Sequence, residues 1–267
     1  MLATEWILVF LLLGCFVGFM AGLLGIGGGG IMVPVLTSLF LLQGVPVEHV
    51  VHLALGTSMA SIIITSISSL RAHHAKGAVI WKVVKSMAPG IVIGTFLATL
   101  LVSYISSVYL ALFFSLFMAY VAIRMFLNTA PKPEKNISAH TDLFIAGSGI
   151  GAISAMVSIG GGSLTVPYLI RQNIDMKKAI GTSAAIGLPI SIAGTLGYVI
   201  NGWESYSIGN YTFGYVYLPA VLLISTASFF TAPYGAKLAH NLNITTLKKV
   251  FSILLIILSI KMLISIL

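Results

Sequence analysis

The stretch GIGGGGIMVP, residues 25–34, decides how the N-terminal part of this chain is interpreted. Four consecutive glycines, Gly27 to Gly30, interrupt a long apolar segment, although each glycine costs a helix about 1 kcal/mol relative to alanine. A similar phrase, IGGGSLTVP, occupies residues 159–167, and matching glycines lie 133 residues apart (160 − 27). The two phrases therefore predict matched breaks in two apolar helices.

The composition predicts an all-α integral membrane protein that crosses the plasma (inner) membrane several times. The 267 residues are 58% hydrophobic and only 7% charged, whereas soluble domains carry about 25% charged residues. Several apolar runs approach the roughly 20 residues that span a bilayer. The N-terminus contains Glu5 and no basic residue, which indicates a retained first helix instead of a cleaved signal peptide.

Ten apolar segments follow one another along the chain. They cover approximately residues 6–25, 31–43, 51–70, 86–104, 107–127, 143–159, 163–171, 179–200, 214–236 and 247–267. The second and seventh are too short to cross a bilayer alone. Whether these two cross the membrane or re-enter from one side stays open at this point.

The segments divide into two matching halves. ALGTSMA, around Gly56, returns as AIGTSAA, around Gly181, in the same order relative to the glycine phrases. The hydrophilic stretch NTAPKPEKNISAHTD, residues 128–142, is typical of a linker. We therefore predict a first repeat at 1–127, a cytoplasmic linker at 128–142 and a second repeat at 143–267, related by internal duplication.

The distribution of basic residues predicts that the two repeats have opposite orientations. The loop at residues 71–85 is rich in Lys and Arg, and so is the region before the second GTS triplet, with Arg171, Lys177 and Lys178. Both are expected on the cytoplasmic side. The loop before the first GTS triplet, QGVPVEHVVH, lacks Lys and Arg and is expected outside. Five membrane segments per repeat, or three helices plus a re-entrant hairpin, satisfy this pattern, which is typical of secondary transporters.

The glycine phrases predict a binding cavity near the middle of the membrane. Non-helical backbone survives at that depth where it is buried in protein or lines a wet cavity. Short helices starting near Ile31 and Leu164 would direct free N–H groups at an anion. Ser163 suits an N-cap, and Pro34 and Pro167 suit a first turn. The alternative is that these glycines only allow close helix packing.

The predicted substrate-binding set combines backbone and hydroxyl groups. Its members are Gly27, Gly28, Gly29, Gly30, Gly160, Gly161, Gly162 and Ser163 from the glycine phrases, with Thr57, Ser58, Thr182 and Ser183 from the GTS triplets. The alternative for the hydroxyls is a hydrogen bond to their own helix.

Several classes of function are disfavoured by what surrounds these motifs. The acidic residues fall in loops or near segment ends, which predicts neither a buried proton-carrying carboxylate nor a cation cage; they are Glu5, Glu48, Glu134, Asp142, Asp175 and Glu204. The single cysteine, Cys15, excludes an intrachain disulfide. We predict no catalytic residues, metal or other cofactor. The net charge of +8 lies in short loops, which indicates membrane orientation and not nucleic-acid binding.

A few isolated side chains have two readings each. His49 and His52 precede the first GTS triplet and either shuttle a proton or lie at the wet interface. His73 and His74 either attract anions to the inner mouth or contact headgroups. Lys261, deep in the last segment, either snorkels to the outer interface or lines the anion pathway.

The duplicated glycine phrases, the duplicated GTS triplets and the RAHHAKGAV loop before Trp81 resemble the sulfite exporter TauE/SafE family over essentially the whole chain. The resemblance implies transport of sulfur-containing anions such as sulfite, thiosulfate or organosulfonates. The expected function is a secondary transporter that works by alternating access in the lipid bilayer. An anion channel and a transporter of another small organic acid are the alternatives. Coupling to protons and assembly as a homodimer are left open.

Overall fold

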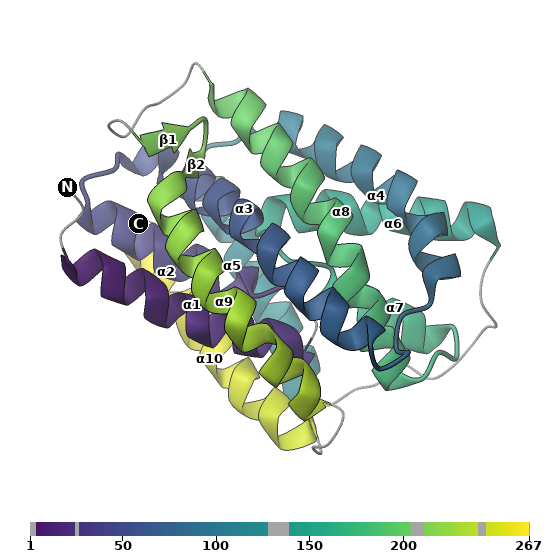
Figure 1. Ribbon diagram of the computed structural model, residues 1–267. Helices are drawn as coiled ribbons and strands as arrows, with labels where there is room; N and C mark the ends of the chain where they lie inside the picture. Colours follow the sequence, from purple (N-terminus) through teal and green to yellow (C-terminus); the bar gives the residue numbers. More distant parts are fainter. Residues whose placement is uncertain (1–3, 25–26, 128–138, 204–210, 240–243, 267) are drawn as a thin grey trace.

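The computed structural model describes residues 4–24, 27–127, 139–203, 211–239 and 244–266. Within these ranges the chain forms ten α-helices and a two-stranded hairpin (Figure 1). Each of the ten predicted segments corresponds to one helix, which confirms an all-α architecture. Most of the predicted linker, residues 128–138, lies outside the described part.

The helices of the first half are α1 (Thr4–Leu24), α2 (Gly29–Leu42), α3 (Val47–His74), α4 (Trp81–Val102) and α5 (Ser107–Phe126). Those of the second half are α6 (His140–Val157), α7 (Gly162–Arg171), α8 (Met176–Gly202), α9 (Leu218–Ala239) and α10 (Ile244–Ile266).

Seven of the described helices are long and apolar enough to span a membrane, namely α1, α3, α4, α5, α8, α9 and α10. By contrast, α2 has 14 residues and α7 has 10. At a rise of about 1.5 Å per residue they reach only about 21 and 15 Å, short of a hydrocarbon core of about 30 Å. Both short helices follow a glycine phrase, so the predicted breaks are present.

The central helices α3 and α8 are the two longest and pack side by side, and pairs of shorter helices flank them (Figure 1). The most extensive contacts join α1 to α9 and α4 to α6, while α5 packs on α10. Glycines permit the close approach in both flanking pairs. A β-carbon at Gly14 of α1 would lie 2.5 Å from Ile224 O, and one at Gly151 of α6 would lie 2.5 Å from Ile91 O. Small residues at such crossings let membrane helices approach closely.

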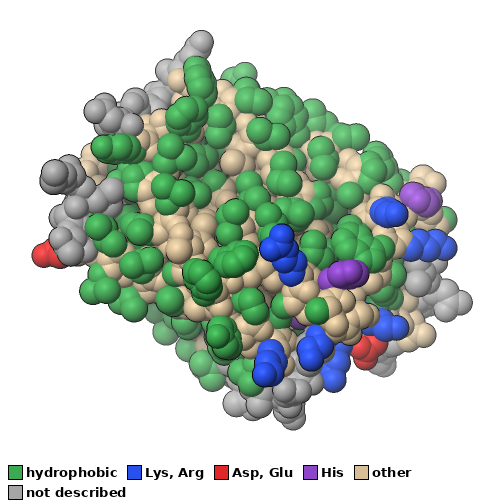
Figure 2. All heavy atoms as spheres, viewed as in Figure 1, with side chains coloured by type: hydrophobic (Ala, Val, Ile, Leu, Met, Phe, Trp, Pro, Cys, Tyr) green, Lys and Arg blue, Asp and Glu red, His purple; other side chains and the backbone are tan. Residues whose placement is uncertain are grey.

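The surface separates into an apolar belt and a basic end. Large exposed side chains such as Leu8, Leu101 and Ile264 are 60–73% exposed, as expected where lipid is the solvent. Figure 2 shows Lys and Arg side chains toward the right and lower right of the view, around the end where α3 finishes and α4 begins. The opposite end, around the β-hairpin, shows none on this face. Lys261 is exposed on α10, and its snorkelling stays a prediction.

The β-hairpin is a feature that the sequence reading missed. The ninth segment was predicted from residue 214, but α9 begins at Leu218 because β1 (Thr212–Phe213) and β2 (Val216–Tyr217) pair first. The two-residue connection begins with Gly214, whose φ of 54° suits a tight hairpin turn. The hairpin packs Tyr215 and Tyr217 against the first half of α3, and both are buried.

Candidate functional site

The two glycine phrases meet at the centre of the molecule. A β-carbon at Gly27 would lie 2.6 Å from the Cα of Gly160, its counterpart in the second phrase. It would also lie 3.5 Å from Ile62, near the middle of α3, and a β-carbon at Gly187, near the middle of α8, would lie 2.8 Å from Gly160 O. The two breaks therefore touch each other beside the midpoints of α3 and α8.

The short helices start earlier than predicted. Gly28 and Gly161 adopt left-handed φ values of 82° and 87°, so α2 begins at Gly29 and α7 at Gly162 instead of Ile31 and Leu164. The predicted N-cap role of Ser163 is therefore wrong. Gly161 is the N-cap of α7, with no side-chain cap, because a left-handed glycine turns the chain directly into the helix.

The earlier starts also move the two prolines. Pro34 and Pro167 are each the sixth residue of a helix and therefore lie in the second turn instead of the first.

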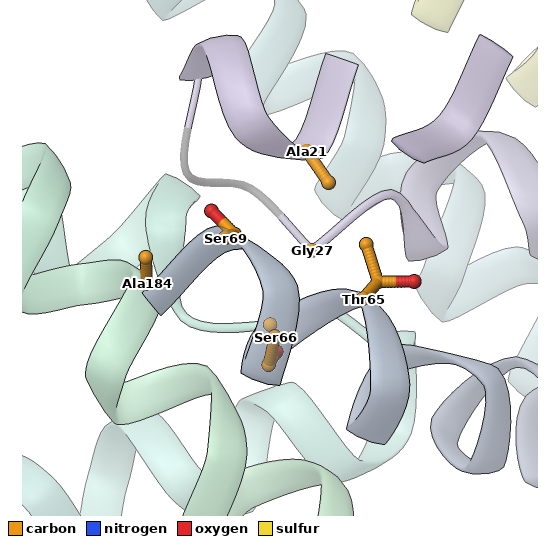
Figure 3. A pocket seen from close by; sticks show the side chains of 7 residues that line it. Ala21, Gly27, Thr65, Ser66, Ser69 and Ala184 are labelled. Atoms are coloured by element: carbon orange, nitrogen blue, oxygen red, sulfur yellow. The ribbon is translucent and has the colours of Figure 1, made fainter. Parts of the chain in front are cut away.

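A small cavity adjoins the meeting point of the glycine phrases (Figure 3). It is lined by Ala21, Gly27, Thr65, Ser66, Ser69, Gly160 and Ala184. Its volume is about 10 Å³, the lower limit for a single water molecule. None of the lining residues is charged, so any charged ligand would be held by hydroxyl and backbone groups. We call this space the central cavity.

The hydroxyl groups of the central cavity come from the second half of α3. Figure 3 shows Thr65 and Ser69 on α3 beside the turn at Gly27. Thr65 Oγ1 lies 2.7 Å from Ser228 Oγ of α9. Ser69 is 2% exposed, and its Oγ has no hydrogen-bond partner in the described part of the chain. An unpartnered buried hydroxyl beside a cavity is available to a ligand.

The sequence reading missed these hydroxyls, although a signal was present. Thr57, Ser61, Thr65 and Ser69 recur at every fourth residue of α3, which is a polar stripe on one helix face. At the positions that match Thr65 and Ser69, α8 has Ile190 and Gly194 (65 + 125 and 69 + 125). Ser66 matches Ser191 of α8, but Ser191 does not line the cavity, so all the lining hydroxyls come from α3.

The GTS triplets do not line the central cavity. Thr57 Oγ1 accepts a hydrogen bond from Tyr217 N–H at 2.9 Å, one residue before α9. Thr182 Oγ1 accepts one from Ile80 N–H at 3.0 Å, one residue before α4. Each half of the chain thus holds the start of a long helix that belongs to the other half.

The glycine of each triplet completes this contact. A β-carbon at Gly56 would overlap the carbonyl oxygen of Tyr215, and one at Gly181 would lie 2.5 Å from Ala78 O. In each case this carbonyl belongs to the residue two positions before the one whose N–H bonds to the threonine. In each half, therefore, the glycine contacts a carbonyl of a crossing backbone segment, and the threonine next to it accepts a hydrogen bond from an N–H of the same segment. We call these two contacts the Gly-Thr clasps.

Removing a clasp hydroxyl should destabilise the fold. Thr57→Val or Thr182→Val would leave a backbone N–H without its acceptor, at a cost of about 1–3 kcal/mol. Thermal unfolding of the purified protein in detergent measures this loss. Thr57→Ser and Thr182→Ser are the matched controls, because serine keeps the acceptor oxygen. Equal midpoints for the valine and serine variants would show that the clasp bonds contribute nothing.

The remaining predicted hydroxyls are buried away from the central cavity. Ser58 and Ser183 are 0% exposed. The hydroxyls of Ser58 and Ser163 have no partner among the described residues. Their contact with an anion stays a prediction.

His52 is not at a wet interface, as the sequence reading favoured, but is 4% exposed. Its Nε2 lies 3.1 Å from Val102 O and its Nδ1 lies 3.3 Å from Ser107 Oγ. The hairpin covers it, since the rings of His52 and Tyr215 are 5.1 Å apart. Because the hairpin was not predicted, the burial of His52 beneath it was not predicted either.

Comparison with known proteins agrees over nearly the whole chain. The family model "Sulfite exporter TauE/SafE" matches residues 10–262. A "Probable membrane transporter protein" of Haemophilus influenzae is 39% identical over 260 residues, covering 97% of this chain and 98% of the relative.

More distant relatives carry similar names. A probable membrane transporter protein of Methanocaldococcus jannaschii is 29% identical over 240 residues, 87% of this chain and 86% of the relative. "Probable membrane transporter protein YdhB" of Bacillus subtilis is 28% identical over 208 residues, 75% and 80% of the two chains. No solved structure matches.

Proposed function

Because this chain belongs to the sulfite exporter TauE/SafE family and is a multi-pass membrane transporter, we propose that it moves a small sulfur-containing anion by alternating access. Sulfite, thiosulfate and an organosulfonate are the proposed substrates. The names of the family and of its relatives are those of transporters and not of enzymes.

The observation that carries the proposal is the central cavity. Two broken helices meet there, and the free hydroxyl of Ser69 lies beside them without a charged neighbour in the lining. Hydroxyl donors and backbone N–H groups at helix starts can bind an anion, and the lining contains no carboxylate that would favour a cation. Gly27, Gly160, Thr65, Ser66 and Ser69 are the proposed contacts.

The second part of the proposal is an inverted repeat, with residues 1–127 and 143–267 as its halves. Three observations support it. In the two repeats α1 corresponds to α6, and α4 corresponds to α9. The packing of α1 on α9 therefore has its counterpart in the packing of α6 on α4. The two Gly-Thr clasps obey the same exchange. The concentration of Lys and Arg at one end agrees with the predicted orientation.

The small volume of the central cavity supports the alternating-access part of the proposal. A space of about 10 Å³ cannot hold a sulfite ion together with its contacts. We propose that one half moves against the other to widen the cavity toward each side in turn, as in other transporters with inverted repeats.

Flux measurements on the full chain in liposomes test the proposal. We expect saturable uptake of sulfite or thiosulfate that is accelerated by unlabelled substrate on the far side. Saturable flux without this acceleration would favour an anion channel. No flux of either anion by folded protein would overturn the sulfur-anion assignment, and a panel of small organic acids would then identify the substrate.

Cysteine accessibility provides a second prediction. In a Cys15→Ser background, Ala184→Cys would place a thiol in the lining of the central cavity. We expect slow modification by a small membrane-impermeant thiol reagent, at a rate that changes when substrate is added. Ala185→Cys is the matched control, since Ala185 is buried but does not line the cavity. Equal rates at both positions, with or without substrate, would contradict alternating access at this site.

A further inference from the structure

A second, larger pocket lies at the end of the molecule away from the Lys and Arg side chains. It has a volume of about 360 Å³, which is enough for a small ligand. Its walls are the first turns of α3, the connection from α4 to α5, and Tyr215 of the hairpin. The polar lining residues are Glu48, His49, His52, Ser103, Tyr104, Ser106, Ser107 and Tyr215. We call it the outer pocket.

The hydrogen bonds of His52 leave a place for an additional proton. Val102 O can only accept, so Nε2, 3.1 Å away, carries a hydrogen. Ser107 donates its single hydroxyl hydrogen to Glu48 O at 2.6 Å. The Oγ of Ser107, 3.3 Å from His52 Nδ1, can therefore only accept from that nitrogen. A doubly protonated, cationic imidazole donates a hydrogen bond in both contacts. In the neutral ring, Nδ1 and the Ser107 oxygen would face each other with no hydrogen between them.

Such a cation would have no counter-ion within the described protein. No carboxylate lies within ion-pair distance of His52 among the described residues. The titratable groups that face the outer pocket are Glu48 and His49 from α3, Tyr104 from the α4–α5 connection and Tyr215 from the hairpin. Glu48 is exposed and His49 is partly buried. A buried cation without a partner is unfavourable, so an anion in the outer pocket and a proton on His52 would each stabilise the other.

The start of α5 adds donors to the same pocket. Ser107 and Val108, the first residues of α5, line it. The N-cap residue Ser106 makes no side-chain cap, so the first-turn N–H groups lack that acceptor. Together with a protonated His52, they would offset the negative charge of Glu48 in the same lining and offer donors to an anion.

We propose that the outer pocket is a loading site that binds one small oxyanion together with one proton held by His52. The inference rests on the proposed function only for the choice of anion, because binding at this pocket is measured separately from transport. Binding of the proton and of the anion must be reciprocal, since each changes the affinity for the other by the same factor. The site would thereby deliver a proton with each anion.

Calorimetry on the purified full chain in detergent tests the proposal, with thiosulfate as the probe. Thiosulfate stays a dianion between about pH 5 and about pH 8, so a pH effect in that range reports histidine titration. We expect the affinity to fall by up to about tenfold per pH unit above the imidazole titration. Buffers with different ionisation enthalpies should reveal uptake of one proton per anion.

Four variants separate the outer pocket from other sites. His52→Gln should abolish proton uptake and weaken binding at acidic pH, whereas His140→Gln, at the basic end, should leave both unchanged. Glu48→Gln should tighten binding, because it removes a negative charge from the lining. Ser61→Ala, on α3 but outside the lining of both pockets, should leave the proton-linked binding intact. Thermal unfolding of each variant establishes that it is folded.

The outcomes are distinct from those of the transport assay. Three results would each overturn the loading site: proton-linked binding that survives His52→Gln, weaker binding in Glu48→Gln, or no binding by folded wild-type protein. Flux without this binding would leave the proposed function standing. Proton-linked binding without flux would support the outer pocket and overturn the transport proposal instead.

Discussion

Gly29→Ala is expected to abolish transport and to reduce the yield of folded protein. Gly29 is the first residue of α2, and a β-carbon there would overlap the carbonyl oxygen of Ser158, next to the second glycine phrase. The obstacle is backbone, so no side chain can rotate away, and overpacking of this kind costs about 1–3 kcal/mol or more. Gly29 does not have a positive φ, so the effect comes from the contact and not from backbone strain.

Gly149→Ala is the matched control for this substitution. Gly149 lies inside α6, and a β-carbon there would meet nothing within 4 Å. Alanine should be neutral there or stabilise the helix by up to about 1 kcal/mol. Thermal unfolding in detergent and flux in liposomes compare the two variants. Wild-type stability and flux in Gly29→Ala would mean that Gly29 does not pack against the carbonyl of Ser158 in the folded protein.

Ser69→Ala is expected to weaken substrate binding without destabilising the protein. If the Ser69 hydroxyl donates to the bound anion, its loss removes a hydrogen bond to a charged group, worth about 1.5–3 kcal/mol, or roughly 10- to 150-fold in KM. The same hydroxyl has no partner among the described residues, so its removal should leave the unfolding midpoint unchanged or raise it. A lower affinity with equal or greater stability distinguishes a ligand contact from a structural one.

Ser61→Ala serves as the control on the same helix. The Ser61 hydroxyl donates to Thr57 O at 2.9 Å, within its own helix, and such bonds contribute little to helix stability. Its KM for sulfite or thiosulfate should stay within about twofold of the wild type. If Ser69→Ala also leaves KM unchanged, the central cavity is not the binding site.

The ten helices could be predicted because their cause is local. Apolar runs of sufficient length must be helical in a bilayer, since no water is present to satisfy the backbone. The breaks could be predicted for the same reason, because Gly28 and Gly161 permit the left-handed turns observed there. The β-hairpin was missed because its short strands are stabilised by burying Tyr215 and Tyr217 against other parts of the chain.

The candidate site was only partly predictable. The duplication of Gly56-Thr57 as Gly181-Thr182 marked these residues as important, but their partners Tyr217 and Ile80 lie 160 and 102 residues away. Sequence alone could not distinguish a hydroxyl that holds crossing backbone from one that meets a substrate. Only the packed structure separates these clasps from the free hydroxyl of Ser69.

From the sequence we could predict the membrane class, the helical segments and the position of the two breaks, whereas the division into two matching halves stays a prediction. Each of these follows from composition, length or residues close together along the chain. The tertiary structure alone decided that Gly27 meets Gly160, which hydroxyls face the central cavity, and that His52 is buried under the hairpin. These outcomes depend on contacts between residues far apart in sequence, which hydrophobic periodicity does not encode.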